Sequence, residues 1–132
     1  MRSISPKRRK RMEAVREYRR RLIEDTGLCM ICGNSPKVRR YGVADMNLLC
    51  CHEILNGPDR DKVLDEPSCL LVLCWGCNQY EVTDKTRWPL SRQLAVLKQK
   101  APERYDRERV MWLRNPNAPD FVTEHEVDQW TT

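Results

Sequence analysis

Two pairs of cysteines, each spaced Cys-x-x-Cys, constrain this chain more than any other feature. Cys29 and Cys32 form the first pair, Cys74 and Cys77 form the second, and 41 residues lie between the pairs. Each pair can supply two thiolates from a tight turn, and four thiolates complete a tetrahedral site for which Zn²⁺ is the usual metal. A closed site of this kind has no open position for a reaction. We therefore expect a structural Zn²⁺ that joins two distant parts of a small core.

The alternative is that these four residues are free thiols buried in the core. The chain has seven cysteines, an odd number, and its basic N-terminal residues lack the apolar stretch of a secretory signal. Metal binding is therefore favoured over disulfides. Cys69 lies in an apolar run and is expected in the core, and the adjacent Cys50 and Cys51 are expected on opposite faces of a strand.

The bulk composition indicates a single globular domain with short extensions. Of 132 residues, 40% are hydrophobic and 33% are charged, which is enough apolar material for a modest core. No apolar run approaches the roughly 20 residues that a membrane-spanning helix needs. We expect a soluble, cytoplasmic protein without a membrane partner.

The N-terminal 27 residues are expected to form one amphipathic helix. Ser5 precedes Pro6 as an N-cap precedes a proline in the first turn, and Gly27 is suited to end the helix. Apolar residues recur at helical spacing: Met12, Val15, Tyr18 and Leu22. This stripe should pack on the body of the protein.

Basic side chains cover the rest of this helix. The expected outward-facing cations are Arg8, Arg9, Lys10, Arg16, Arg19, Arg20 and Arg21. With 24 Lys and Arg against 19 acids, the net charge is +5, and a basic arm on a near-neutral body suggests a polyanion as partner. A solvated helix face without a partner is the competing interpretation.

The remaining segments predict an α+β fold. Residues 38–55 are rich in strand formers with a bend at Gly42, residues 69–74 form an apolar run typical of a buried strand, and a short helix follows the second cysteine pair. Further helices are expected from Trp88 and from Pro102, then a linker at 115–119 and a short helix capped by Thr123. We divide the chain into an N-terminal helix (1–27), a core (28–86) and a helical extension (87–132).

The segments "CMIC", "CHEI" and "LLVLCWGCN" lie in an order of cysteine pair, β segment, loop, apolar strand, cysteine pair and helix. In these segments and in this order, the chain resembles the HNH endonucleases over about Cys29 to Asp84. The resemblance implies a small ββα-metal core that is stapled by the four-cysteine Zn²⁺ site and flanked by helices. It also implies hydrolysis of DNA phosphodiester bonds, in which a histidine takes a proton from water and Mg²⁺ or Mn²⁺ stabilises charge on the phosphate.

The resemblance carries three residues into the implied site. His52 and Glu53 end the first strand and are the implied catalytic pair. Both residues, together with Asn78 after the second cysteine pair, are also the implied ligands of the catalytic divalent ion. Alignment on Ile54 makes His52 a metal ligand and Glu53 the base, whereas alignment on the histidine makes His52 the base. The chain departs from the family pattern because Asn78 replaces the usual last histidine, and because the usual middle asparagine is missing near Cys69.

Each of these residues also has a structural interpretation. His52 could be a satisfied polar residue at a strand end, and Asn78 could be a helix N-cap. The residues expected to contact nucleic acid are Arg60, Lys62, Arg39, Arg40, Arg9, Lys10, Arg16 and Arg20, although ordinary surface charge would explain each one singly. His125 is expected to be a surface or packing residue, and Trp75 and Trp88 are expected in the core.

Three functions follow as hypotheses. The first is a metal-dependent endonuclease that nicks or cuts DNA with low sequence specificity, encoded by a bacterial host or a phage. The second is a zinc-stabilised nucleic-acid-binding module that does not cut. The third is an interaction module in a phage assembly or recombination complex. A homodimer or a phage protein is an open further partner.

Overall fold

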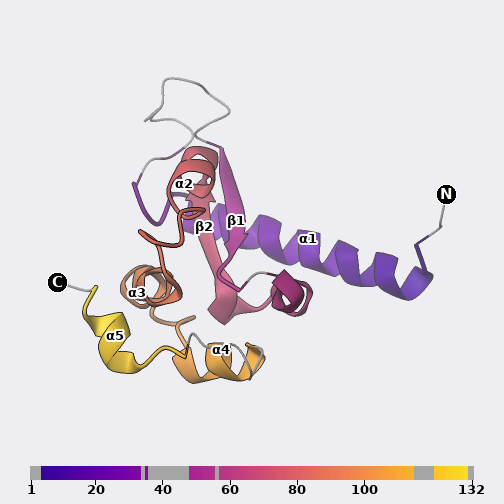
Figure 1. The fold of residues 1–132 in the computed structure, drawn as a ribbon. Coiled ribbons are helices and arrows are strands. Elements are labelled where there is room, and N and C mark those ends of the chain that lie inside the picture. The colour runs from indigo at the N-terminus through magenta and orange to yellow at the C-terminus, as the bar shows by residue number, and fades with distance from the viewer. Residues whose placement is uncertain (1–3, 34, 36–47, 56, 115–120, 131–132) are drawn as a thin grey trace.

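The computed structural model describes residues 4–33, 35, 48–55, 57–114 and 121–130 (Figure 1). The expected bend at Gly42, the linker at 115–119, and Arg39 and Arg40 lie outside these residues. The fold is α+β, as predicted: one two-stranded sheet is combined with several helices. None of the described helices is long and apolar enough to span a membrane.

An antiparallel hairpin lies at the centre of the molecule. Strand β1 (Leu49–Glu53) pairs with β2 (Leu70–Cys74), and the register places Leu49 opposite Cys74 and Glu53 opposite Leu70. Every residue of β2 is buried, which confirms the strand predicted from the apolar run, although the strand begins at Leu70. Two 3-10 helices, η2 (Gly57–Val63) and η3 (Pro67–Cys69), connect the strands.

Helix α1 (Pro6–Thr26) packs across the hairpin and extends beyond it (Figure 1). The Ser5 side chain accepts a hydrogen bond from the Arg8 amide, and Gly27 ends the helix with φ of 70°, a left-handed conformation suited to glycine. Val15 is the fully buried residue of the predicted apolar stripe. Both predicted helix boundaries are therefore confirmed.

Within the described residues, four shorter α-helices follow the hairpin. They are α2 (Trp75–Tyr80), α3 (Leu90–Lys100), α4 (Arg107–Leu113) and α5 (Glu124–Asp128). The helix expected to start at Pro102 starts instead at Arg107, because the Asp106 side chain caps the Arg109 amide and residues 101–105 form turns. Thr123 and Glu126 form the predicted capping box of α5.

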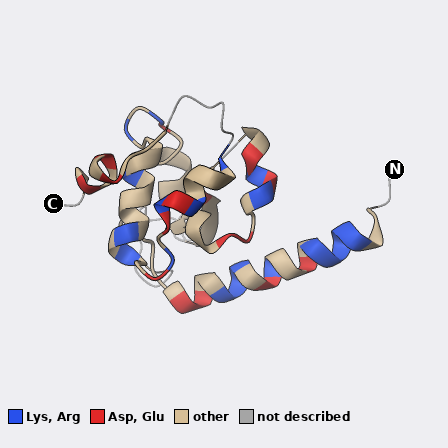
Figure 2. Ribbon diagram, turned by 90° about the horizontal axis from the view of Figure 1, so that it is seen from below, with Lys and Arg blue, Asp and Glu red and all other residues tan. Residues whose placement is uncertain are grey.

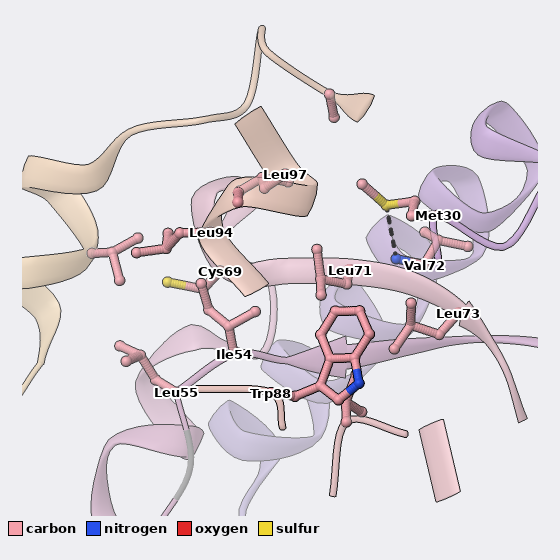
Figure 3. Packing of buried hydrophobic residues seen from close by; sticks show 14 of the residues in the cluster. Met30, Ile54, Leu55, Cys69, Leu71, Val72, Leu73, Trp88, Leu94 and Leu97 are labelled. Carbon is pink, nitrogen blue, oxygen red and sulfur yellow. Dashed lines mark hydrogen bonds between the residues drawn. The ribbon is translucent and has the colours of Figure 1, made fainter. Parts of the chain in front are cut away.

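One hydrophobic core joins the hairpin to the C-terminal helices (Figure 3). Leu71 and Leu73 of β2 lie near Trp88, and Leu94 and Leu97 of α3 belong to the same buried cluster. The division of the chain at residues 27 and 86 remains a prediction, but residues on both sides of the second boundary share this core.

Candidate functional site

The four paired cysteines meet in one cluster, as the sequence predicts. Their sulfur atoms all lie within 4.8 Å of one another, and the Sγ atoms of Cys32 and Cys74 are 3.8 Å apart. Four thiolates around Zn²⁺ with bonds of about 2.3 Å have sulfur separations of about 3.8 Å. The geometry therefore suits a structural Zn²⁺, and it joins the turn after α1 to the end of β2 and the start of α2.

Local structure positions these cysteines. The first pair lies in a tight turn, where the Gly33 amide donates to the Cys29 carbonyl and Gly33 has φ of 75°. In the second pair, Cys74 is the N-cap of α2, and its sulfur accepts a hydrogen bond from the Cys77 amide at 3.4 Å. An amide hydrogen aimed at sulfur in this way stabilises the thiolate form.

The close packing of the four thiols perturbs their acidity. A hydrogen bond from the Cys77 thiol lowers the pKa of Cys29 to about 4, whereas burial raises the pKa of Cys74 to about 11. Four thiols this close would bind Zn²⁺ as thiolates, and the ion would supply the charge that keeps all four deprotonated.

Strand β1 presents alternate side chains to two different layers. The Cys50 sulfur lies 3.5 Å from Asn78 Nδ2, so Cys50 and His52 face α2 and α3. Cys51 lies against the Arg19 carbonyl, so Cys51 and Glu53 face α1. The prediction that Cys50 and Cys51 occupy opposite faces is confirmed, and the same alternation separates His52 from Glu53.

His52 makes two contacts through its ring nitrogens. Nδ1 lies 3.1 Å from Asn78 Oδ1, and Nε2 lies 3.0 Å from Gln93 Oε1. Burial lowers the pKa of His52, although the hydrogen bonds to Gln93 and Asn78 oppose this effect. The neutral imidazole is therefore the favoured form at neutral pH.

Asn78 is the fourth residue of α2, and the cap of this helix is Cys74. The alternative interpretation of Asn78 as an N-cap is therefore wrong, because the cysteine pair begins the helix earlier. Its amide instead bridges the Cys50 sulfur and the His52 ring. The structure thus brings together two of the three residues that the resemblance carries into the site.

Glu53, the third of these residues, points to the other face of the hairpin. Its Oε1 accepts hydrogen bonds from Arg19 NH2 at 2.7 Å and from Arg60 Nε at 3.4 Å. Burial tends to raise the pKa of Glu53, but the backbone and Arg19 hydrogen bonds outweigh this effect and lower it. Within the described residues, the four cysteines form the one cluster of at least three His, Cys, Asp or Glu side chains close enough to share an ion.

Replacing Glu53 by Gln is expected to lower the free energy of unfolding by about 1–3 kcal/mol, because the half-buried Arg19 loses its carboxylate partner. Arg19 Nε is already buried without a hydrogen bond from the described residues. Urea denaturation at neutral pH measures the change. Glu17→Gln is the matched control, because Glu17 pairs with Arg20 and Arg21 on the exposed face of α1 and should matter less. Equal effects of the two substitutions would contradict this assignment.

The predicted phosphate-contacting cations fall into two groups. Arg60, Lys62 and Arg20 are already engaged: Arg60 with Glu53, Lys62 with Asp59 and the Leu113 carbonyl, and Arg20 with Glu17 and Glu24. Arg19, expected at the surface of α1, is instead held by Glu53. By contrast, several exposed side chains have no hydrogen bond or ion pair among the described residues: Lys7, Arg8, Arg9, Lys10 and Arg16.

These unpaired cations dominate the half of α1 nearest the N-terminus, as the blue segments in Figure 2 show. The acids of α1 lie mostly in its other half, where they neutralise neighbouring arginines. The first turns of α1 therefore offer a positive surface that is free to bind an anion.

Two other sequence predictions concern aromatic residues and the second histidine. Trp88 is buried, as expected, but Trp75, the first residue of α2, is 42% exposed, so its expected place in the core is wrong. His125 is exposed, which favours the surface position over the packing role that was the other expectation. The sequence did not single out Gln93 as a residue that contacts the site. The one sequence feature that could have indicated Gln93 is its position: a polar side chain on the helix face that otherwise carries Leu90, Leu94 and Leu97.

No protein-family model, curated protein or solved structure matched this chain. The structure itself defines a four-cysteine metal-type cluster beside a two-stranded antiparallel hairpin, and no family can be assigned.

Proposed function

We propose that this chain is a metal-dependent endonuclease that hydrolyses DNA phosphodiester bonds, with His52 and Asn78 as ligands of a divalent ion. The observation that supports this proposal is the 3.1 Å separation of His52 Nδ1 and Asn78 Oδ1, two electron-pair donors from different elements. Adjacent ligands of an octahedral Mg²⁺, with bonds of about 2.1 Å, lie about 3 Å apart.

The chemistry of the two ligands fits Mg²⁺ or Mn²⁺. Imidazole nitrogen and amide oxygen are suitable donors, and two protein ligands leave positions for water and phosphate oxygens. An ion held there would neutralise charge that develops on the phosphate. Arg60 contacts Glu53 on the opposite face of β1 from His52, and this long 3.4 Å contact leaves a 63% exposed side chain that is available to a flanking phosphate.

With His52 as a ligand, the resemblance gives Glu53 the role of base, but Glu53 points to the opposite face of β1 from His52. The Glu53 carboxylate must then release Arg19 and Arg60 before it accepts a proton. The ion pairs of Glu53 with Arg19 and Arg60 oppose its use as a base. They favour a second candidate function, a zinc-stabilised module that binds DNA without cutting it. The unpaired cations at the start of α1 suit both functions.

A plasmid assay tests the nuclease proposal. Wild-type protein with Mg²⁺ or Mn²⁺ is expected to nick supercoiled plasmid, and His52→Ala or Asn78→Ala should reduce the rate by about 100-fold or more. His125→Ala is the matched control, because it removes the other, exposed histidine and should leave the rate unchanged. If the wild type does not nick, or if His52→Ala nicks as fast, the proposal fails.

The salt dependence of DNA binding tests the role of α1 in either function. Replacing Lys7, Arg8, Arg9 and Lys10 by Gln is expected to reduce the slope of log K against log salt by about 0.9 for each phosphate that these cations neutralise. The matched control is Arg20→Gln with Arg21→Gln, because these cations are paired within α1. An unchanged slope in the first variant would place the DNA-binding surface elsewhere. Binding with a steep slope but without cleavage would support the second function.

A further inference from the structure

Gln93 is a buried polar residue in an apolar layer. It lies in the first turns of α3, is 1% exposed, and neighbours Leu94 in the hydrophobic core. A buried primary amide is costly unless both of its ends are hydrogen-bonded. Both are: Nε2 donates to the Trp88 carbonyl at 3.0 Å, and Oε1 lies 3.0 Å from His52 Nε2.

These contacts determine which ring nitrogen of His52 carries the proton. The Trp88 carbonyl can only accept, so Gln93 Nε2 must face it and Gln93 Oε1 must face the histidine. Since Oε1 can also only accept, His52 Nε2 must carry the hydrogen. In a neutral imidazole the other nitrogen, Nδ1, then has the free lone pair. The Nε2–H form leaves no hydrogen between Nδ1 and Asn78 Oδ1, so it requires either that the Asn78 amide turns its Nδ2 toward Nδ1 or that a cation lies between the two atoms.

We propose that Gln93 is a positioning residue that holds His52 in the Nε2–H tautomer and so directs the Nδ1 lone pair toward Asn78. Metal-binding histidines commonly donate their other ring N–H to a carbonyl or carboxylate, which fixes the tautomer and the ring orientation. The use of Nδ1 as a metal ligand rests on the proposed function. The tautomer itself follows from the contacts of Gln93 alone.

The tautomer is measurable directly in the zinc-loaded, full-length protein. Protonated and unprotonated ring nitrogens have well-separated ¹⁵N chemical shifts, and the chain has only two histidines. His52→Ala assigns the two sets of signals. We expect the Nε2–H form of neutral His52 to exceed the Nδ1–H form by about tenfold or more, because the Nδ1–H form would set the lone pairs of His52 Nε2 and the fixed Gln93 Oε1 against each other, whereas the Asn78 amide can turn to donate to a bare Nδ1. A predominant Nδ1–H form, or an even mixture, in the wild type would overturn the proposal.

Variants test whether Gln93 is the cause. Gln93→Met keeps a side chain of similar length but removes the acceptor, so the tautomer preference should fall by about tenfold. Gln99→Met, an exposed position on the same helix, is the matched control and should leave the spectrum unchanged. Zinc content and circular dichroism show whether each variant is folded. If Gln93→Met does not fold, the tautomer measured in the wild-type protein decides the proposal. An unchanged tautomer in folded Gln93→Met would refute the role of Gln93.

The outcome is separable from that of the nuclease proposal. Adding Mg²⁺ to the labelled wild type should shift the Nδ1 signal of His52 if the ion binds there. A Gln93-dependent Nε2–H tautomer, together with no Mg²⁺ shift and no plasmid nicking, would support the positioning role and reject the metal-dependent nuclease.

Discussion

Replacing Cys74 by Ser is expected to remove the bound metal and to unfold the protein without added denaturant. Structural Zn²⁺ contributes about 10–16 kcal/mol in small zinc domains, which equals or exceeds the whole stability of a typical domain, about 5–15 kcal/mol. Serine keeps the size of the side chain and is a good N-cap for α2, so the change isolates the loss of the sulfur ligand. Metal analysis and circular dichroism measure the two effects.

Cys69→Ala is the matched control for this experiment. Cys69 is a fully buried cysteine outside the four-sulfur cluster, and its replacement should cost only about 1–2 kcal/mol through poorer packing. We expect about one Zn²⁺ per chain in the wild type and in Cys69→Ala. A Cys74→Ser protein that retains its Zn²⁺, or that unfolds at the same urea concentration as Cys69→Ala, would show that the cluster is not a metal centre.

The Leu94→Ala substitution is expected to destabilise the protein by about 2–5 kcal/mol, the usual cost of a cavity at a fully buried leucine. Leu94 is 0% exposed and lies in α3, where it packs in the same cluster as Leu71 of the hairpin (Figure 3). Since the two elements share one core, we also expect a single cooperative transition, measured by urea denaturation with fluorescence and circular dichroism.

Leu90→Ala provides the comparison within the same helix. Leu90 is only partly buried at the start of α3, so its replacement should cost clearly less than that of Leu94. If Leu94→Ala cost no more than Leu90→Ala, or if the helical extension melted separately from the hairpin, then α3 would not be part of the core.

Strong local signals explain which parts of the fold could be predicted from the sequence. The cysteine spacing predicted the cluster because chelation from two turns requires it, and Ser5 and Gly27 predicted the ends of α1 because caps depend on a few neighbouring atoms. The buried strand β2 followed from an uninterrupted apolar run.

The sequence-based predictions missed features that depend on contacts between distant residues: the start of α4, the direction of Glu53 and the contact of Gln93 with His52. Pro102 and Asp106 can both begin a helix, and the turns formed by residues 101–105 leave the role to Asp106. Glu53 is adjacent to His52 in sequence, yet strand geometry turns it toward Arg19, which lies 34 positions earlier. Gln93 lies 41 positions after His52, so only the folded core brings the amide to the ring.

The cysteine cluster also ties strand β2 to the turn after α1. A hairpin whose strands slip by one residue exchanges its two faces, which would turn Glu53 toward Gln93 and His52 toward Arg19. Cys74 is both the last residue of β2 and a member of the cluster, and it lies opposite Leu49 at the first pair of the hairpin. Because its three partner sulfurs lie in the turn after α1 and in α2, the cluster fixes the end of β2 relative to both helices. The pairing of β1 with this fixed strand then determines which of its side chains face α1 and which reach the candidate site.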